Sequence, residues 1–485
     1  MRLVTLCFIS ATALFAQSAA PRSLGDLSGR WWLALDGRVW ESRGASELRF
    51  HSFDKYSGNP VLRADKPWEG RIAYLYGTVL PQETGNGLRM WYHAHVDDKT
   101  LLASKHGYTN LYATSKDGVH WEKLALGTNY FAGGRANNIV LMRPDGPGES
   151  HSPNVIHAPW ESDPNRRYKM VTYTYYDGYY GAISPDGTHW TDLPHRQILE
   201  DPGDVGNFVW DGVRGAYIGY PKVFETIRGT RRRCVGFTET REFESWPKAR
   251  LIFSPDEEDD RGYKTPAGRT EFYGLSAFPY QTLYIGFLWI YRLEAGDERI
   301  WPELVYSADG VQWSRVPSPR KAVLPLGADG SWDDGMIFTA NQPVMRDGQI
   351  YLYYGGFDGP HNAKNAHAAV GLATMRRDGF ASLTAGAEET AITTVPLQGT
   401  NGELLANADM RGGELRAELL DTSGVPLPGF EKGNAVAVRG NHTAHALRWN
   451  GKTALPATEF RVRFWLRQGA LYSFFAGAQA GLAPR

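Results

Sequence analysis

Cysteine is nearly absent from this chain. The 485 residues contain two cysteines, Cys7 and Cys234, and Cys7 falls inside an apolar N-terminal run. If that run is removed as a secretory signal, Cys234 alone remains, so an intramolecular disulfide is excluded. We therefore expect the mature fold to be stabilised by the burial of apolar surface.

An excess of charge of either sign is also missing. Lys and Arg number 52 against 53 Asp and Glu, which gives a formal net charge of −1. A balanced chain has no basic field to attract nucleic acid or an anionic membrane, so we expect neither as a partner. No segment after the N-terminal run is long and apolar enough to cross a membrane.

The N-terminus has the features of a secretory signal. Arg2 supplies the positive end, residues 3–15 are largely apolar, and residues 16–20 include small side chains suited to cleavage. Residues 1–20 are therefore predicted to be a signal peptide. We expect the mature protein to be exported to the periplasm or the medium, with no membrane insertion after cleavage.

A short motif, S-x-D-G-x-x-W, recurs along the chain. Full copies occupy residues 115–121, 184–190 and 307–313, a degenerate copy lies at 238–246, and a partial copy lies at 377–383. Asp-Gly favours a tight turn between strands. We expect the Trp to pack against the neighbouring unit, and the spacing indicates five units.

The segments before each turn are strand-like. Each unit holds three or four apolar or aromatic runs, and helical periodicity is almost absent. The sequence therefore predicts an all-β fold, a five-bladed β-propeller over residues 21–385; an irregular β-sandwich is the alternative. The repeat stops near Thr384, and alternating apolar and polar residues predict a C-terminal β-sandwich over residues 386–485.

Each predicted unit carries an acid just before its first strand. In a propeller these strands converge on one axis, so the acids would face a common mouth. A ring of carboxylates suits glycoside hydrolysis, in which one carboxyl group protonates the leaving oxygen and another activates water or attacks the sugar. Each acid taken singly is more simply a turn cap or a partner of Arg. The acids are Glu69, Glu149, Asp204, Glu271, and Asp333 with Asp334.

Three of these acids are predicted to be catalytic: Asp204, Glu271 and Asp333. An apolar run follows Glu271, and less polar surroundings would raise its pKa and suit it to general acid catalysis. Asp333 would be the base or nucleophile. The residues predicted to bind substrate are Trp68, Glu69, Glu149, His151, Asn154, Asn207, Tyr273, Trp332 and Asp334.

Other chemistry is weakly indicated. His93, His95 and His361 are the candidate metal ligands, but alternate histidines on a strand occur as often in cores or on surfaces, and we predict no metal. Nucleotide-binding and C-x-x-C motifs are missing, so no cofactor is expected. Residues 231–233, three consecutive arginines, are predicted to be a solvated hairpin tip.

Several segments resemble the five-bladed propeller glycoside hydrolases, a group with invertase-like, arabinanase-like and mannoside-phosphorylase-like members. They are residues 58–62 (GNPVL), residues 67–69 (PWE), the repeated turns, and the closing residues 376–383. The resemblance covers about residues 40–385. The C-terminal part is similar to the trailing sandwich of invertase-like enzymes. The resemblance implies a carbohydrate enzyme that uses Asp and Glu from separate blades.

The invertase-like motifs W-M-N-D-P-N-G, R-D-P and E-C are absent, so no subfamily is assigned and no nucleophile is transferred by motif. The function expected is that of an exported glycoside hydrolase acting on an oligo- or polysaccharide. One alternative is a glycoside phosphorylase, which needs a basic phosphate pocket near the acids; Arg135 and Arg269 are candidates. The other is a carbohydrate-binding propeller without catalysis.

Overall fold

A computed structural model describes residues 29–96, 107–142, 150–174, 177–200 and 202–478. The predicted signal peptide and Glu149 lie outside these residues. The described residues form strands and short 3-10 helices and contain no α-helix, which confirms the all-β class. No helix in these ranges is long and apolar enough to span a membrane. The 3-10 helices are η2 (Pro67–Glu69), η3 (Pro164–Arg166), η4 (Glu258–Asp260) and η5 (Lys432–Asn434).

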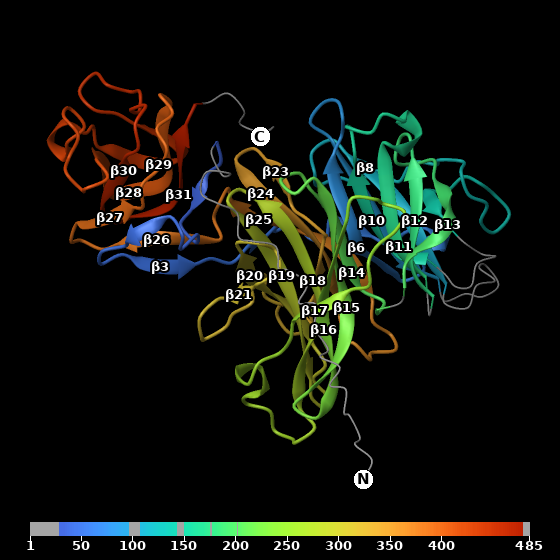
Figure 1. Ribbon diagram of the computed structural model, residues 1–485. Helices are drawn as coiled ribbons and strands as arrows, with labels where there is room; N and C mark the ends of the chain where they lie inside the picture. The colour runs from blue at the N-terminus through green and yellow to red at the C-terminus, as the bar shows by residue number, and fades with distance from the viewer. Residues whose placement is uncertain (1–28, 97–106, 143–149, 175–176, 201, 479–485) are drawn as a thin grey trace, which may run out of the picture.

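Five antiparallel groups of strands, called meanders 1 to 5 below, follow one another along the chain (Figure 1). Meander 1 comprises β6 (Ile72–Pro81), β7 (Leu88–His95), β8 (Tyr108–Ser115) and β9 (Ile139–Leu141). Meander 2 comprises β10 (Ser150–His157), β11 (Tyr168–Thr174), β12 (Gly178–Ser184) and β13 (Thr191–Leu199). Meander 3 comprises β14 (Gly206–Asp211), β15 (Ala216–Ile227), β16 (Thr230–Thr240) and β17 (Arg250–Phe253).

Meander 4 comprises β18 (Arg269–Tyr280), β19 (Leu283–Leu293), β20 (Ile300–Ser307) and β21 (Ser314–Arg315). Meander 5 comprises β22 (Met336–Thr339), β23 (Val344–Arg346), β24 (Gln349–Phe357) and β25 (Ala368–Arg376). Two short N-terminal strands, β4 (Asp54–Lys55) and β5 (Leu62–Arg63), pair with β25 and complete this meander. Its outer edge is thus covered by chain from far away in the sequence, which removes an exposed strand edge.

The first strand of each meander, or in one bond Asn341 just after β22, is bonded to the first strand of another meander. These hydrogen bonds run from meander 1 to 2, 2 to 3, 3 to 4, 4 to 5 and back to 1, so they form a closed ring. The donor and acceptor pairs are Val155 N to Thr78 Oγ1 at 2.8 Å, Phe208 N to Asn154 Oδ1 at 3.2 Å, Ala277 N to Asn207 Oδ1 at 3.3 Å, Ser276 Oγ to Thr339 O at 3.4 Å, and Asn341 N to Gly77 O at 3.0 Å.

The three full turn motifs share one hydrogen-bond pattern. In each, the Ser hydroxyl accepts from the Gly amide and the Asp carboxylate accepts from the two amides after the Gly. The predicted Trp contacts between units are confirmed. Trp121 of the first turn packs 5.4 Å from Tyr353 in meander 5, and Trp313 packs 5.8 Å from Tyr220 in meander 3.

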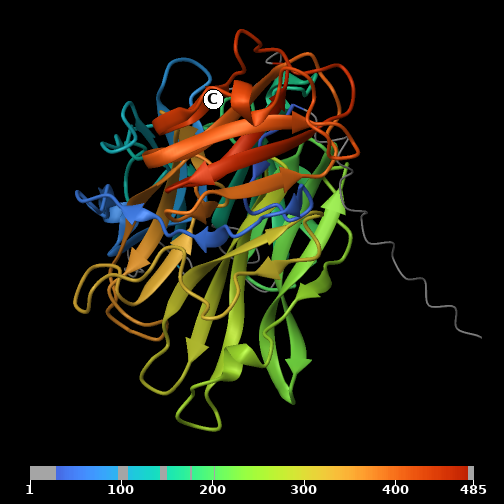
Figure 2. The same cartoon turned by 90° about the vertical axis from the view of Figure 1, so that its left-hand side faces the viewer.

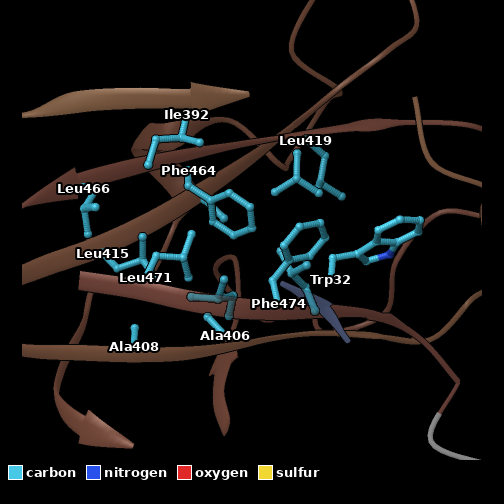
Figure 3. Packing of buried hydrophobic residues seen from close by; sticks show 14 of the residues in the cluster. Trp32, Ile392, Ala406, Ala408, Leu415, Leu419, Phe464, Leu466, Leu471 and Phe474 are labelled. Atoms are coloured by element: carbon cyan, nitrogen blue, oxygen red, sulfur yellow. The ribbon is translucent and has the colours of Figure 1, made fainter. Parts of the chain in front are cut away.

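A nine-stranded sheet, called the C-terminal sheet, lies to one side of the meanders (Figures 1 and 2). Its strands from the C-terminal part of the chain are β26 (Ala381–Ala385), β27 (Thr390–Thr394), β28 (Glu403–Leu420), β29 (Val438–Leu447), β30 (Arg461–Arg467) and β31 (Gly469–Gly477). Both halves of β28 contribute to one core: Ala406 and Ala408 pack with Leu415 and Leu419 (Figure 3). The sheet is therefore folded over its own core.

The N-terminal part of the chain also enters this sheet. Strands β1 (Trp32–Leu33), β2 (Trp40–Ser42) and β3 (Glu47–Phe50) pair with β31, β27 and β26. The sequence assigned residues 21–385 to the propeller and 386–485 to the sandwich, whereas strands β1–β3 and β26 belong to the C-terminal sheet. The strands β1 to β3 are two to four residues long, too short to show an alternating pattern.

Candidate functional site

The starts of the first strands meet in an aromatic cluster, called the central cluster. Tyr74, Tyr273, Trp289, Phe338 and Phe357 are among its buried members, and they come from meanders 1, 4 and 5. Segments far apart in sequence are brought together here because the first strands of the meanders are joined by the ring of hydrogen bonds. The cluster is therefore where side chains from several meanders can act on one molecule.

Asp204 lies just before β14 at this cluster and pairs with Lys222 of β15. The Lys222 side chain is 3% exposed and that of Asp204 is 34% exposed. Burial opposes ionisation of Asp204, but the Lys222 ammonium outweighs it and holds the carboxyl pKa below its usual value. Asp204 is thus an accessible carboxylate that stays ionised.

Tyrosine hydroxyls surround this ion pair. The Lys222 ammonium lies 4.8 Å from the ring centroid of Tyr273, whose hydroxyl is 3.0 Å from His361 Nε2. Burial, followed by the Asp204 charge, raises the pKa of Tyr273, and burial with Tyr273 nearby raises that of Tyr76. Tyr76 also stacks on Trp289, with centroids 5.4 Å apart. These phenols keep their protons at neutral pH and can donate hydrogen bonds.

Glu271 on β18 lies next to the central cluster, but in surroundings opposite to those predicted. Its carboxylate, 2% exposed, is 2.5 Å from Arg233 Nη1 and 2.9 Å from Arg269 Nε. The expected apolar setting is absent because Arg269 lies two residues away on the same strand face and Arg233 arrives from β16. Both carboxylate oxygens are thus held by guanidinium groups, which leaves neither free to meet a leaving-group oxygen.

The three arginines 231–233 are not a hairpin tip, which corrects the prediction. They lie within β16, and the tip falls between Ile227 and Thr230. Arg232 is buried and pairs with Asp260, Arg233 pairs with Glu271, and Arg231 stacks on Phe224. Strand alternation separates them, so consecutive arginines serve different partners.

His151 reaches the same region from β10. Its Nδ1 lies 2.7 Å from Ser152 Oγ, and its charge is among the influences that lower the pKa of Asp204. His93 is fully buried beside Tyr74, and burial lowers its pKa well below the usual value. Within the described ranges no group of three or more His, Cys, Asp or Glu residues could hold a metal ion.

Glu69 and Trp68 lie away from the central cluster, in a buried network of meander 1. Glu69 is fully buried and accepts hydrogen bonds from Tyr92, at 2.7 Å, and from Lys123. The Trp68 indole donates to Asn138 at 2.6 Å. With these partners both side chains contribute to the packing of meander 1. For Glu69 this agrees with the alternative given above, in which a single acid has a structural role and does not bind substrate.

Asp333 is also engaged in contacts of its own meander. It lies 2.6 Å from Lys55 Nζ and accepts from the Tyr354 hydroxyl at 2.9 Å, and neither partner contacts Asp204 or Glu271. Asp334 accepts from the Gly330 amide at 2.6 Å, so it caps a turn. The structure therefore groups Asp204 with Glu271 and leaves Asp333 apart.

Asn154 and Asn207 are members of the ring of hydrogen bonds. Their amides bond to backbone groups of other meanders, including the Asn341 carbonyl of meander 5. Together with Asn341, Tyr76 and Trp289 they also line a narrow cavity. Their side chains join the meanders at the floor of the candidate site.

Sequence analysis missed Lys222, Arg233 and the role of His361 beside Tyr273. The predicted site residues were acids and polar residues near strand starts, whereas Lys222 and Arg233 lie within β15 and β16. A lysine inside the otherwise apolar run of β15 that ends at Phe224 was the available signal, because a charge buried in a strand requires a partner.

No protein-family model matches the sequence, and no curated protein does. Solved structures align with about two thirds of the chain. An N-acetylgalactosamine deacetylase from F. plautii aligns with 15% identity over 70% of this chain and 97% of its own, with a TM-score of 0.45. A glycosyl hydrolase from Bacteroides ovatus aligns with 15% identity over 68% and 94%, with a TM-score of 0.46.

A β-1,2-mannobiose phosphorylase from Listeria innocua aligns with 11% identity over 67% of this chain and 96% of its own, with a TM-score of 0.46. The activities in these names are those of the matched proteins.

Proposed function

We propose that meanders 1 to 5 are the blades of a five-bladed β-propeller with the central cluster at its mouth. The closed ring of hydrogen bonds supports this arrangement, because each first strand is bonded to the next and the fifth to the first. Two Trp contacts between units support it too, since Trp121 packs against meander 5 and Trp313 against meander 3, in both cases the preceding meander of the ring.

The activity proposed is cleavage of a glycosidic bond at this mouth, in an exported glycoside hydrolase. One observation carries it: Asp204 is ionised, 34% exposed, and set among aromatic rings beside the buried Lys222. Aromatic faces such as that of Tyr76 suit the apolar faces of sugar rings. An ionised carboxylate in that setting can activate water or attack the anomeric carbon.

The neighbouring residues take roles that follow from their contacts. Lys222 keeps Asp204 ionised. Tyr273, whose pKa is raised, holds its proton and can donate a hydrogen bond to a sugar oxygen, while its contact with His361 fixes its position. Glu271 is a positioning residue, because its carboxylate holds Arg233 against the rings of Tyr273 and Tyr291.

Glycoside phosphorolysis is the second candidate, and one observation favours it. Lys222, Arg233 and Arg269 bring three positive charges to the two carboxylates Asp204 and Glu271. The excess positive charge could hold a phosphate group. Of the two arginines predicted for this purpose, Arg269 is close to the acids, whereas Arg135 bonds to the Thr128 carbonyl in an exposed loop.

The test is turnover of aryl glycosides and polysaccharides by the purified protein, with and without inorganic phosphate. Free sugar released without phosphate supports hydrolysis, and sugar 1-phosphate formed only with phosphate supports phosphorolysis. Asp204→Asn should lower turnover at least about a hundredfold in protein that is still folded at the assay temperature, although the loss of the partner of the buried Lys222 lowers the melting temperature. Asp347→Asn, an exposed turn acid with positive φ, is the matched control. If the protein binds glycans but turns over none of them, the result supports a carbohydrate-binding propeller without catalysis.

A further inference from the structure

A groove of about 410 Å³ lies between meander 5 and the start of meander 1. It opens at the same end of the strands as the candidate site, because Ala368 both lines the groove and belongs to the central cluster. None of the side-chain roles described above uses this space. The groove is large enough for a sugar ring, and its edge at Ala368 adjoins the central cluster.

Trp332 forms one wall of the groove and is held rigidly. Its ring stacks on Tyr354, with centroids 5.6 Å apart and planes 24° apart. The hydroxyl of Tyr354 is in turn bonded to Asp333, which pairs with Lys55. A side chain at Gly356 would meet the indole, since an added Cβ would lie 2.5 Å from it. The backing by Tyr354 and the missing side chain at 356 set the indole as a fixed, half-buried platform.

The charged side chains of the groove differ in how far they are engaged. Arg71 donates to the backbone carbonyls of Ala366 and Lys364, and Asp358 pairs with His367. The exposed Arg63 guanidinium makes no hydrogen bond or ion pair with any residue in the described ranges. A guanidinium next to an aromatic platform is suited to a planar carboxylate, which it can bind through two parallel hydrogen bonds.

We propose that this groove binds a sugar ring that carries a carboxylate, a uronate unit of the glycan cleaved at the mouth. The ring stacks on Trp332, its carboxylate pairs with Arg63, and Asp358 accepts from a hydroxyl. The last step, that the uronate belongs to a cleaved glycan, rests on the proposed function. The binding itself does not.

The test uses oligogalacturonate, oligoglucuronate and oligomannuronate, each with its carboxyl-reduced counterpart, in titration calorimetry against the full chain. At least one oligouronide should bind about tenfold more tightly than its reduced counterpart. Added salt should weaken this preference, because it screens an exposed charge pair.

Two variants assign the binding to the groove. Arg63→Gln should abolish the uronate preference and leave binding of the reduced sugar unchanged, while Trp332→Ala should weaken both. Arg411→Gln, an exposed arginine of the C-terminal sheet, is the control and should change neither. Equal binding of every pair, or a preference that survives Arg63→Gln, overturns the proposal.

The two proposals fail in different ways. If uronate binding depends on Arg63 but the protein turns over no glycoside, the uronate site stands and the proposed enzymatic activity is refuted. If turnover depends on Asp204 but no oligouronide binds more tightly than its reduced counterpart, the enzymatic activity stands and the uronate site is refuted. Because Arg63 is exposed, its variant should fold, so an unfolded Trp332→Ala protein does not remove the test.

Discussion

Lys222 controls the pH at which Asp204 carries its charge. The carboxyl pKa of Asp204 is lowered in the folded protein because the Lys222 charge outweighs burial, so activity that needs the carboxylate is lost only as pH falls through that lowered pKa. Lys222→Gln removes the charge and leaves burial, which raises the pKa. The acid limb of kcat/KM against pH should therefore move to higher pH. An acid limb at the wild-type position would show that Lys222 does not set this titration.

A variant of Glu271 distinguishes the proposed positioning role from the general acid role predicted from the sequence. Glu271→Gln leaves Arg233 and Arg269 without their shared carboxylate, and we expect it to lower the free energy of unfolding by roughly 1–3 kcal/mol. Urea denaturation measures this, with Asp347→Asn as the control. Unchanged stability, together with a loss confined to substrates with poor leaving groups, would restore the general acid role predicted from the sequence.

At the residue scale, the sequence predicted positions better than roles. Asp204, His151 and Tyr273 lie together because acids and polar residues at strand starts do converge. The surroundings of Glu271 were not predictable from its own strand, since Arg233 comes from β16. Partners of this kind are set by packing between strands, which a linear pattern does not record.

At the scale of elements, the repeated turns allow one interaction to be compared at two degrees of burial. Asp309 is 3% exposed and accepts from the amides of Val311 and Gln312, whereas the side chain of Asp117, in the equivalent turn, is 51% exposed. Asp309→Ala leaves a buried amide unbonded, and we expect a loss of about 2–3 kcal/mol in the free energy of unfolding.

Asp117→Ala should cost about 1 kcal/mol or less, because water can replace the lost carboxylate. Urea denaturation of both variants tests the difference. Equal losses would mean that burial of the turn does not decide its contribution.

The turns were predictable from sequence because Ser, Asp, Gly and Trp act within seven residues of one another. Strands β1 to β3 were not, because each is short and its partner lies more than 300 residues away. Local chemistry is visible in a sequence, whereas long-range pairing of short strands depends on the completed fold.

At the scale of the whole molecule, Asp378 joins the meanders to the C-terminal sheet. Its carboxylate, fully buried, accepts from the Tyr280 hydroxyl of meander 4 at 2.7 Å and from the Ser473 hydroxyl of β31 at 2.6 Å. Arg376 at the end of β25 adds bonds to Asn407 and to the His442 carbonyl. The partial copy of the turn motif thus serves as the link between the two parts of the molecule.

Asp378→Asn should therefore uncouple the two parts. Asn keeps the shape and tolerates the positive φ at this position, but its amide nitrogen would face donors in place of an acceptor, at a cost of about 1–3 kcal/mol. Scanning calorimetry should show one transition for the native chain and a lower, broadened or split transition for the variant. Asp347→Asn shares the positive φ in an exposed turn and should behave as the native chain does. A single transition at the native temperature for Asp378→Asn would mean that the remaining contacts, those of Arg376 among them, hold the two parts together without the Asp378 carboxylate.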